Sequence, residues 1–258
     1  MLRPALSFFL VSTLICCTQL SWAKGPQTVS KKEVRKILKD NPELIFEALH
    51  GHEEQLYDLL QIGLKKKNKS RIREGRLKQL KNPKIAALRP DRPVWGTPNG
   101  KINIIVFSDF QSATSTKADK VIHALLKKHP NINYRFRHNP LGLHKMSIPA
   151  ARYYEALAIQ SHAKAMKLNR LLLQNRLAIN KKGTKILDEL ARKCEADMAQ
   201  LHRDLNSAQV NARIEGDRRE ARKLGLTAAP VFLVNGVTVT GAAPAKEFEE
   251  VFAIIREN

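Results

Sequence analysis

Residues Phe107 to Val121 read FSDFQSATSTKADKV, and they directly follow the apolar run INIIV. The apolar run predicts a buried strand, and the spacing of apolar residues after Ser112 predicts a helix. The stretch therefore joins the end of a strand to the start of a helix through a tight turn. A serine at the first position of a helix accepts a hydrogen bond from a backbone N–H, which contributes about 1 kcal/mol. We expect Ser112 to cap this helix.

The chain after this stretch predicts a mixed α/β domain. The segment INYRFRH, residues 132–138, alternates like a strand, and a long helical region follows over about residues 148–224. The segment VFLVNGVTVTG predicts a hairpin, because Asn235-Gly236 is a strong signal for a type I′ turn. A last helical pattern covers residues 244–257. This order predicts a central sheet with helices on both faces.

The N-terminal residues have the pattern of a signal peptide. Arg3 precedes the apolar run ALSFFLVSTLICC, and SWA places small residues before a cleavage site after Ala23. An uncleaved N-terminal anchor and a lipoprotein attached through Cys16 or Cys17 are the alternatives. We expect an exported protein that is soluble or peripheral on a membrane.

A helical arm is predicted between the signal peptide and the α/β domain. Apolar residues recur at spacings of three and four from about Lys31 to Lys81, with a break at Asn41-Pro42. Such a stripe is usually buried against another copy, another protein or the body of the same chain, and we favour self-association. The predicted parts are residues 1–23 (signal peptide), 24–82 (helical arm for oligomerisation or docking), 83–100 (Pro- and Gly-rich linker) and 101–258 (α/β domain).

The chain is strongly basic, with 45 Lys and Arg residues against 24 Asp and Glu residues and a formal net charge of +21. Like charges packed as closely as in KKKNKSRIREGRLKQLKNPK repel one another unless an anionic partner is near. We expect this run to contact anionic lipid, lipopolysaccharide, cell-wall polymer or an acidic protein, and the alternative is an ordinary solvated helix face. Nucleic acid is not expected, because no aromatic residues are interleaved. The basic patch consists of Lys65, Lys66, Lys67, Lys69, Arg71, Arg73, Arg76 and Lys78.

Three segments of the α/β part resemble one protein family. FSDFQSATS, HNPLGLHKMSIPAARYYEAL and LGLTAAPVFLVNG are similar to the active-site turn, the entry into the helical insert and the cis-proline segment of DsbA-like thioredoxin-fold proteins, which are exported bacterial thiol-disulfide oxidoreductases. The resemblance covers roughly Val94 to Asn258. It implies a thioredoxin-like fold with a DsbA-type helical insertion, and a location in the periplasm. NPELIFEAL in the arm resembles the helical N-terminal extension through which some relatives oligomerise.

The chain departs from this family at the two residues that carry its chemistry. Ser112 and Ser115 occupy the positions of the two active-site cysteines, and only Cys194 remains once the signal peptide is removed. A serine hydroxyl is too weak an acid to replace the thiolate that exchange requires, and it forms no bond analogous to a disulfide. We therefore predict that thiol-disulfide exchange is excluded and that the protein is not an enzyme of this kind.

Other sites follow from the resemblance or from residue spacing. The resemblance implies that Pro230 is the cis-proline and that Ala229 and Pro230 line a groove able to hold an extended peptide. No cofactor and no metal site are predicted, because the histidines lack the spacing of ligands. A serine nucleophile would need His138 or His144 as its base, and no G-x-S-x-G elbow is present. We expect Cys194 to be a partly buried small residue, with a mixed disulfide to a partner as the alternative.

Three hypotheses of function follow. The first is a redox-inactive structural or adaptor component of a cell-envelope assembly such as a secretion system. Its partners would be other envelope proteins, joined in a homo-oligomer or a multi-subunit complex through residues 31–81. The second is a periplasmic chaperone that holds exported polypeptides, and the third is an enzyme with unrecognised serine-based chemistry. The arm and the basic run favour the first hypothesis, because a simple holdase needs neither.

Overall fold

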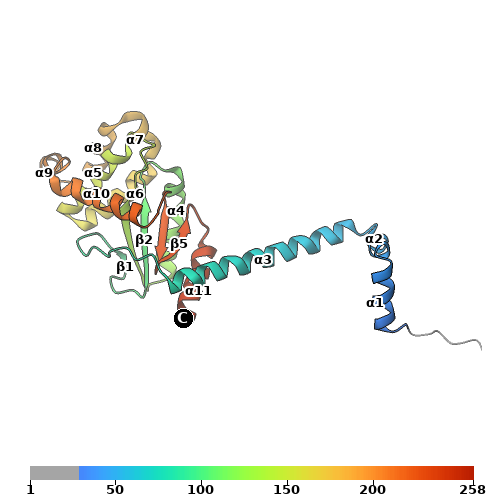
Figure 1. Ribbon diagram of the computed structural model, residues 1–258. Helices are drawn as coiled ribbons and strands as arrows, with labels where there is room; N and C mark the ends of the chain where they lie inside the picture. Colours follow the sequence, from blue (N-terminus) through green and yellow to red (C-terminus); the bar gives the residue numbers. More distant parts are fainter. Residues whose placement is uncertain (1–28) are drawn as a thin grey trace, which may run out of the picture. The chain divides into compact units, whose positions relative to one another are not determined.

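The computed structural model describes residues 29–258, so the predicted signal peptide lies outside the described residues. The domain contains one mixed sheet with the strands β1 (Trp95–Gly96), β2 (Ile102–Ser108), β3 (Ile132–His138), β4 (Val231–Val234) and β5 (Val237–Thr240). Their order is β1-β3-β2-β4-β5 (Figure 1). β2 and β3 are parallel, whereas the other three pairs of strands are antiparallel.

β2 is the central strand, and its alternate residues enter two different cores. Ile104 and Val106 belong to the larger core, whereas Ile105 and Phe107 belong to a smaller core that also contains Leu233 of β4. Because both faces of β2 are buried, an almost continuous apolar run suits this position. The prediction of a buried strand that ends at the active-site turn is confirmed.

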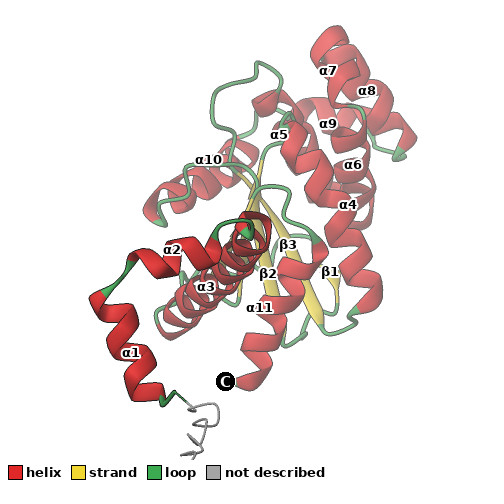
Figure 2. Cartoon of the chain, turned by 90° about the vertical axis from the view of Figure 1, so that its right-hand side faces the viewer, coloured by secondary structure: helices red, strands yellow, loops and turns green. Residues whose placement is uncertain are grey.

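Helices lie on both faces of the sheet, which confirms the predicted α/β class (Figure 2). The larger core packs β2 against helices that include α4 and α11, and the C-terminal half of α10 places Ala221 in the smaller core. The helices that follow β3 and precede β4 form the predicted insertion. Within residues 29–258, no helix has both the length and the apolar character needed to cross a bilayer. The helices of the domain are α4 (Ala113–Lys128), α5 (Ser147–Gln160), α6 (His162–Gln174), α7 (Arg176–Lys182), α8 (Thr184–Lys193), α9 (Met198–Asp204), α10 (Ala208–Lys223) and α11 (Ala245–Glu257).

The turn between β4 and β5 confirms the predicted hairpin. Asn235 and Gly236 have φ values of 45° and 86°, and a type I′ turn requires positive φ at both positions. The Asn235 side-chain oxygen accepts a hydrogen bond from the N–H of Asn103 at 2.7 Å, which joins the turn to β2. A Cβ atom on Gly236 would lie 2.3 Å from Cβ of Pro83. Glycine is therefore required here both by the turn and by the close approach of the neighbouring segment.

Three helices precede the domain, namely α1 (Lys31–Asp40), α2 (Glu43–Leu49) and α3 (Glu53–Lys81). Ser30 and Glu33 form a capping box at the start of α1. The expected break at Asn41-Pro42 separates α1 from α2, so the helical character of the arm is confirmed. A second break, which the apolar spacing does not reveal, falls at His50-Gly51, where Gly51 has a φ of 84°.

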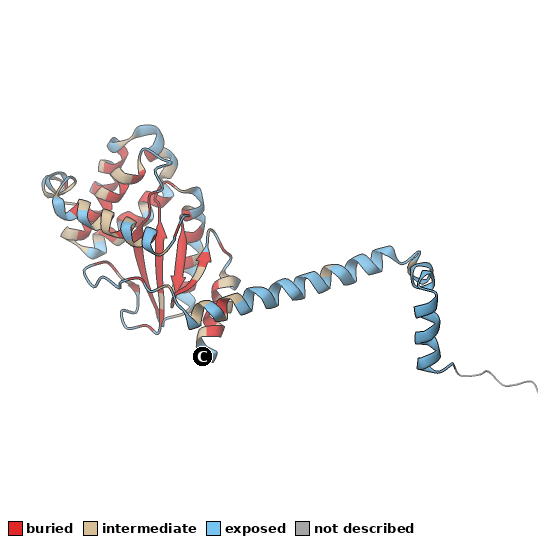
Figure 3. Cartoon of the chain, viewed as in Figure 1, coloured by how far each residue is buried: buried red, intermediate tan, exposed pale blue. Residues whose placement is uncertain are grey.

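The contacts within the chain divide it into two units, Met1–Leu64 and Lys65–Asn258. This division lies inside α3 and before residue 82, at which we placed the end of the arm. In the first unit, α1 and α2 contain no buried residue (Figure 3). In the second unit, the end of α3 is part of the domain, because the side chain of Gln79 accepts a hydrogen bond from the N–H of Thr238 at 2.7 Å. The exposed large apolar side chains of the first unit include Val34, Ile37, Ile45, Phe46, Leu59, Leu60 and Leu64.

The first part of the predicted linker, residues 83–94, lies against the domain. The N–H of Lys84 donates to the carbonyl oxygen of Gly236 at 3.2 Å, and the ammonium group of Lys84 donates to the carbonyl oxygen of Leu224. Ala86 is buried in the smaller core. These residues therefore cover part of the second face of the sheet, and we name them the strap.

Candidate functional site

The N-terminus of α4 and the loop before β4 meet at Ser112. The Ser112 side chain accepts a hydrogen bond from the N–H of Ser115 at 3.3 Å, which confirms the predicted helix cap. Its hydroxyl donates to the carbonyl oxygen of Ala229 at 3.1 Å. The peptide bond between Ala229 and Pro230 is cis. The structure thus brings the turn and the proline segment together, while the role of Ala229 and Pro230 in peptide binding stays a prediction.

Ser112 and Ser115 lie in different surroundings. Ser112 is partly exposed, whereas Ser115 is buried and its Oγ accepts a hydrogen bond from Oγ of Ser108 at 2.8 Å. Ser108 is the last residue of β2, so this contact connects the strand end to the first turn of α4. Nothing in the sequence singled out Ser108, because a serine at the end of a strand is common. Of the two serines, Ser112 is the one that a partner can reach.

Asp109 holds the turn between β2 and α4 in place. One of its carboxylate oxygens accepts a hydrogen bond from the N–H of Gln111 at 2.8 Å, and the other accepts one from the hydroxyl of Ser147 at 2.8 Å. Next to it, Phe110 stacks on Phe136 of β3, with 4.7 Å between the ring centroids. The sequence contains the turn pattern, but the contribution of Ser147 from α5 appears only in the folded chain.

The proline loop offers a free backbone group. The side-chain amide of Asn139 donates to the carbonyl oxygen of Ala228 at 3.0 Å, and the carbonyl oxygen of Ala229 is bonded to Ser112. Within residues 29–258, the N–H of Ala229 has no hydrogen-bond partner. Ala229 is partly exposed, and Pro230 is buried. An unpaired N–H in a partly exposed residue is the kind of group to which an extended peptide can add.

Neither candidate base reaches the serines. Nε2 of His138 lies 2.8 Å from a carboxylate oxygen of Glu155, and both side chains are buried. His144 is exposed. Among the described residues, neither histidine forms a hydrogen bond with Ser112 or Ser115. The arrangement of a serine nucleophile with its base is therefore not assembled.

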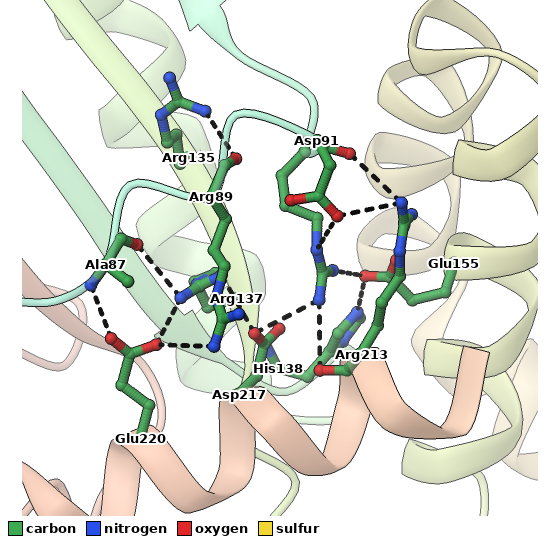
Figure 4. A network of polar contacts seen from close by, with 11 residues as sticks. Ala87, Arg89, Asp91, Arg135, Arg137, His138, Glu155, Arg213, Asp217 and Glu220 are labelled. Carbon is green, nitrogen blue, oxygen red and sulfur yellow. Dashed lines mark hydrogen bonds and ion pairs between the residues drawn. The ribbon is translucent and has the colours of Figure 1, made fainter. Parts of the chain in front are cut away.

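A cluster of buried charges surrounds Glu155 of α5 (Figure 4). Besides His138, the guanidinium group of Arg92 from the strap donates to one of its oxygens, and Arg213 of α10 donates to the other at 3.3 Å. Burial alone would raise the pKa of Glu155, but the hydrogen bond from His138 and the charges of Arg92 and Arg213 hold it below its ordinary value. The carboxylate of Glu155 is therefore ionised and fully paired.

The cluster also contains Asp217, which with His138 and Glu155 places three potential metal ligands within 4.8 Å of one another. However, Nη1 of Arg137 lies 3.2 Å from one carboxylate oxygen of Asp217, and Nη2 of Arg92 lies 3.4 Å from the same oxygen. A cation here would meet guanidinium groups instead of free ligands. The cluster is better suited to joining the strap with β3, α5 and α10 than to holding a metal.

The basic patch divides into structural and exposed residues. Arg76 is buried between Glu247 and Glu250 of α11, at 3.2 and 2.8 Å, and Arg73 pairs with Glu257 at 2.5 Å. These two arginines therefore stabilise the packing of α3 on α11. The other members of the predicted patch are all exposed, namely Lys65, Lys66, Lys67, Lys69, Arg71 and Lys78.

Cys194 follows the end of α8 and is buried, as predicted. Burial raises the pKa of its thiol above the ordinary value, because the thiolate would lose its hydration. A thiol in this state is a weak nucleophile at neutral pH.

Solved structures of DsbA-family proteins are similar to this fold. The thiol-disulfide exchange protein alpha-DsbA2 of Wolbachia pipientis matches with a TM-score of 0.59 at 17% identity, and the match covers 72% of this chain and 98% of that chain. A thioredoxin-like oxidoreductase of Silicibacter pomeroyi gives a TM-score of 0.55 at 26% identity, with coverages of 66% and 94%. ScsC of Proteus mirabilis, in a transitional conformation, gives 0.58 at 15% identity, with coverages of 87% and 94%.

These similarities contradict our prediction that the protein is not an enzyme. Two of the similar structures are described as a thiol-disulfide exchange protein and an oxidoreductase, so the fold points to oxidoreductase activity. The prediction rested on Ser112 and Ser115 at the positions of the two active-site cysteines. The helix N-terminus and the cis peptide bond near them are both present in this chain. The exclusion of enzyme activity is therefore withdrawn.

The sequence itself shows the family. No curated protein sequence gave a significant match, but the profile of the DSBA-like thioredoxin domain matches residues 103–253, more than half of the chain. The matched region begins in β2 and ends in α11, so it includes the start of α4, the helical insertion and Pro230. The chain belongs to the family of DSBA-like thioredoxin domain proteins.

Proposed function

We propose that the protein binds extended segments of other exported proteins along the loop that contains Pro230, and that it acts as an adaptor in a cell-envelope assembly such as a secretion system. The observation that carries this proposal is the N–H of Ala229, which has no hydrogen-bond partner among the described residues. An extended peptide can add to a backbone segment with such a free group through main-chain hydrogen bonds. We call the backbone of Ala229 and Pro230 the Pro230 edge. Ser112, bonded to the carbonyl oxygen of the same residue, fixes the position of the edge.

Small side chains around this edge support the approach of a peptide backbone. Ala228 and Ala229 carry only methyl groups, and Gly241 donates its N–H to the carbonyl oxygen of Pro230 at 2.9 Å. Across from the loop, Ala113 and Thr114 at the start of α4 are exposed. A surface with few large side chains selects its partner mainly through the backbone, which suits an adaptor for several polypeptides.

The arm supplies the second part of the proposal. Its apolar side chains, such as Phe46 at 75% and Leu59 at 65% exposure, are more exposed than such residues usually are in a folded monomer. We assign them to contacts with another copy of the chain or with another subunit. The exposed lysines at the start of the basic run would face an anionic partner, and the predicted signal peptide would place the assembly in the periplasm.

A periplasmic chaperone is the second candidate, and the exposed side chain of Leu143 favours it, because a holdase needs accessible apolar surface. The two functions differ in the range of their partners. An adaptor binds a fixed set of proteins at constant stoichiometry, whereas a chaperone binds many unfolded chains.

Affinity purification from the native cell envelope, followed by quantitative mass spectrometry, tests the proposal. The parent chain is compared with Ala229→Tyr, whose side chain blocks the edge, and with Ala199→Tyr on the exposed face of α9 as the matched control. A fixed set of partners that Ala229→Tyr loses and Ala199→Tyr keeps is the expected result. A broad set of unfolded clients would favour the chaperone, and partners retained by both variants would refute binding at this edge.

A further inference from the structure

A separate hollow of about 540 Å³ opens between the loop after β3 and the end of α10. Neither Ser112 nor Pro230 lines it, so it is distinct from the edge described above. Thr227 in its wall nevertheless precedes Pro230 by only three residues in the chain. The hollow is lined by Asn139, Pro140, Leu141, Leu143, Arg218, Arg222, Gly225, Leu226 and Thr227.

The lining combines exposed apolar side chains with positive charge. Leu141 and Leu143 are 39% and 76% exposed. Arg218 and Arg222 come from the last turns of α10, and the lining contains no Asp or Glu. Arg218 pairs with Glu215 at 2.5 Å, whereas Arg222 has no ion pair within residues 29–258. The charge of Arg222 is therefore available to a ligand.

The walls of the hollow are fixed before any ligand binds. The side-chain amide of Asn139 donates to the carbonyl oxygens of Leu226 and Ala228, at 3.3 and 3.0 Å, and so joins the loop after β3 to the segment after α10. α10 itself is held by Asp217, which accepts a hydrogen bond from the N–H of His138 at 3.0 Å. A preformed hollow costs less to occupy than one that must first be ordered.

We propose that this hollow binds a segment of a partner polypeptide in which large apolar side chains lie next to carboxylates. The apolar side chains pack on Leu141 and Leu143, and a carboxylate pairs with the guanidinium group of Arg222, whose planar fork suits such a partner. The volume lies within the usual range for ligand sites, roughly 300–1,000 Å³. The inference rests on the proposed function, since it names the chemistry of the polypeptide that the Pro230 loop would hold.

Fluorescence anisotropy on the purified full chain tests this inference with two labelled peptides, GSLDLEGS and its uncharged counterpart GSLNLQGS. We expect the acidic peptide to bind at least tenfold more tightly. Arg222→Glu should weaken its binding at least tenfold, and Leu143→Ser should weaken it several-fold. Arg219→Glu is the matched control, because it makes the same charge change at an exposed position of α10 that does not line the hollow.

Equal binding of both peptides, or equal weakening by Arg219→Glu and Arg222→Glu, would overturn the inference. Binding of phosphatidylglycerol vesicles that Arg222→Glu abolishes, without binding of the acidic peptide, would assign the hollow to lipid and would also overturn it. The proposed function can fail separately. If Ala229→Tyr retains all envelope partners while the peptide results are as expected, peptide binding in the hollow is supported and binding at the Pro230 edge is refuted.

Discussion

The hydroxyl of Ser112 donates a hydrogen bond to the carbonyl oxygen of Ala229 at 3.1 Å, although 117 residues separate the two in the chain. The same oxygen atom of Ser112 caps α4 by accepting the N–H of Ser115. One side chain therefore provides an acceptor for a backbone N–H at the start of α4 and also holds the loop that contains the cis peptide bond.

Ser112→Ala should remove both of these hydrogen bonds. Loss of the cap alone costs about 1 kcal/mol, and loss of a second hydrogen bond of ordinary strength adds about 1 kcal/mol. We expect the free energy of unfolding of the domain to fall by about 2 kcal/mol, as measured by urea denaturation. Thr114→Ala, at an exposed position of the same helical turn, should change it by less than about 0.5 kcal/mol. Equal effects of the two substitutions would show that Ser112 has no special role.

The double substitution Ser112→Cys and Ser115→Cys should place an exchange-competent pair of thiols at the start of α4. The Cα atoms of residues i and i+3 in an α-helix lie about 5 Å apart, within the usual Cα separation for a disulfide. The start of α4 lowers the pKa of a thiol at position 112 and so favours the thiolate. We expect insulin reduction by this variant to exceed that of the parent chain, assayed in parallel, by at least tenfold. Ser112→Cys alone should reach only a small part of that rate, and a double variant no faster than the parent would contradict the prediction.

Local signals in the sequence were sufficient for most of the fold. The apolar run of β2 and the Asn235-Gly236 turn are each defined by neighbouring residues, and both are found where they were predicted. The contact of Ser112 with Ala229 was not predicted, because residue spacing contains no signal for a contact over 117 residues. The role of Ser147 in holding Asp109 was missed for the same reason.

The strap shows a different limit of sequence reasoning. Its proline- and arginine-rich residues have the composition of a solvated linker, yet Arg92 is only 3% exposed. A buried arginine is predictable only when its carboxylate partners are known, and these are Glu155 on α5 and Asp217 on α10. In the basic run, Arg76 reads as part of a charged surface for the same reason, although α11 buries it.

Arg92→Met should strongly destabilise the domain. The substitution removes a guanidinium group from Glu155 and Asp217, both of which are almost completely buried. Removal of one partner of a buried ion pair costs about 3–5 kcal/mol, because the other charge stays without compensation. Arg89→Met is the matched control on the strap, since Arg89 is 45% exposed and lies 4.0 Å from Glu220. We expect Arg89→Met to lower the free energy of unfolding by less than about 1 kcal/mol. The free energies of unfolding of both variants are measured by Trp95 fluorescence in urea titrations.

The pH dependence of stability should report on Glu155. Its pKa in the folded domain lies below the ordinary value of 4.5, so the unfolded chain binds the proton more tightly. The stabilisation from this carboxylate is complete above the unfolded pKa and is lost as the pH falls through the folded one. We therefore expect the free energy of unfolding to decrease as the pH is lowered from about 5 to 3. Glu155→Gln should make this decrease shallower, whereas Glu189→Gln on the exposed face of α8 should leave it unchanged.

Self-association of the arm should depend on the apolar residues of α3. Deletion up to residue 64 keeps the last turns of α3, which carry Arg76 and its contacts with α11. We expect light scattering coupled to size exclusion to show a multimer for the chain without its predicted signal peptide and a folded monomer for this deletion.

The matched pair of variants places two lysines one helical turn apart on the intact arm. Leu56→Lys with Leu60→Lys should abolish the multimer, because it puts charge on exposed apolar positions, whereas Glu54→Lys with Asp58→Lys, at exposed polar positions, should retain it. Loss of the multimer in both double variants would show that the net charge of the arm controls assembly. A monomeric parent chain would leave the arm as a docking element for a different protein, since its apolar residues would then have no second copy to contact.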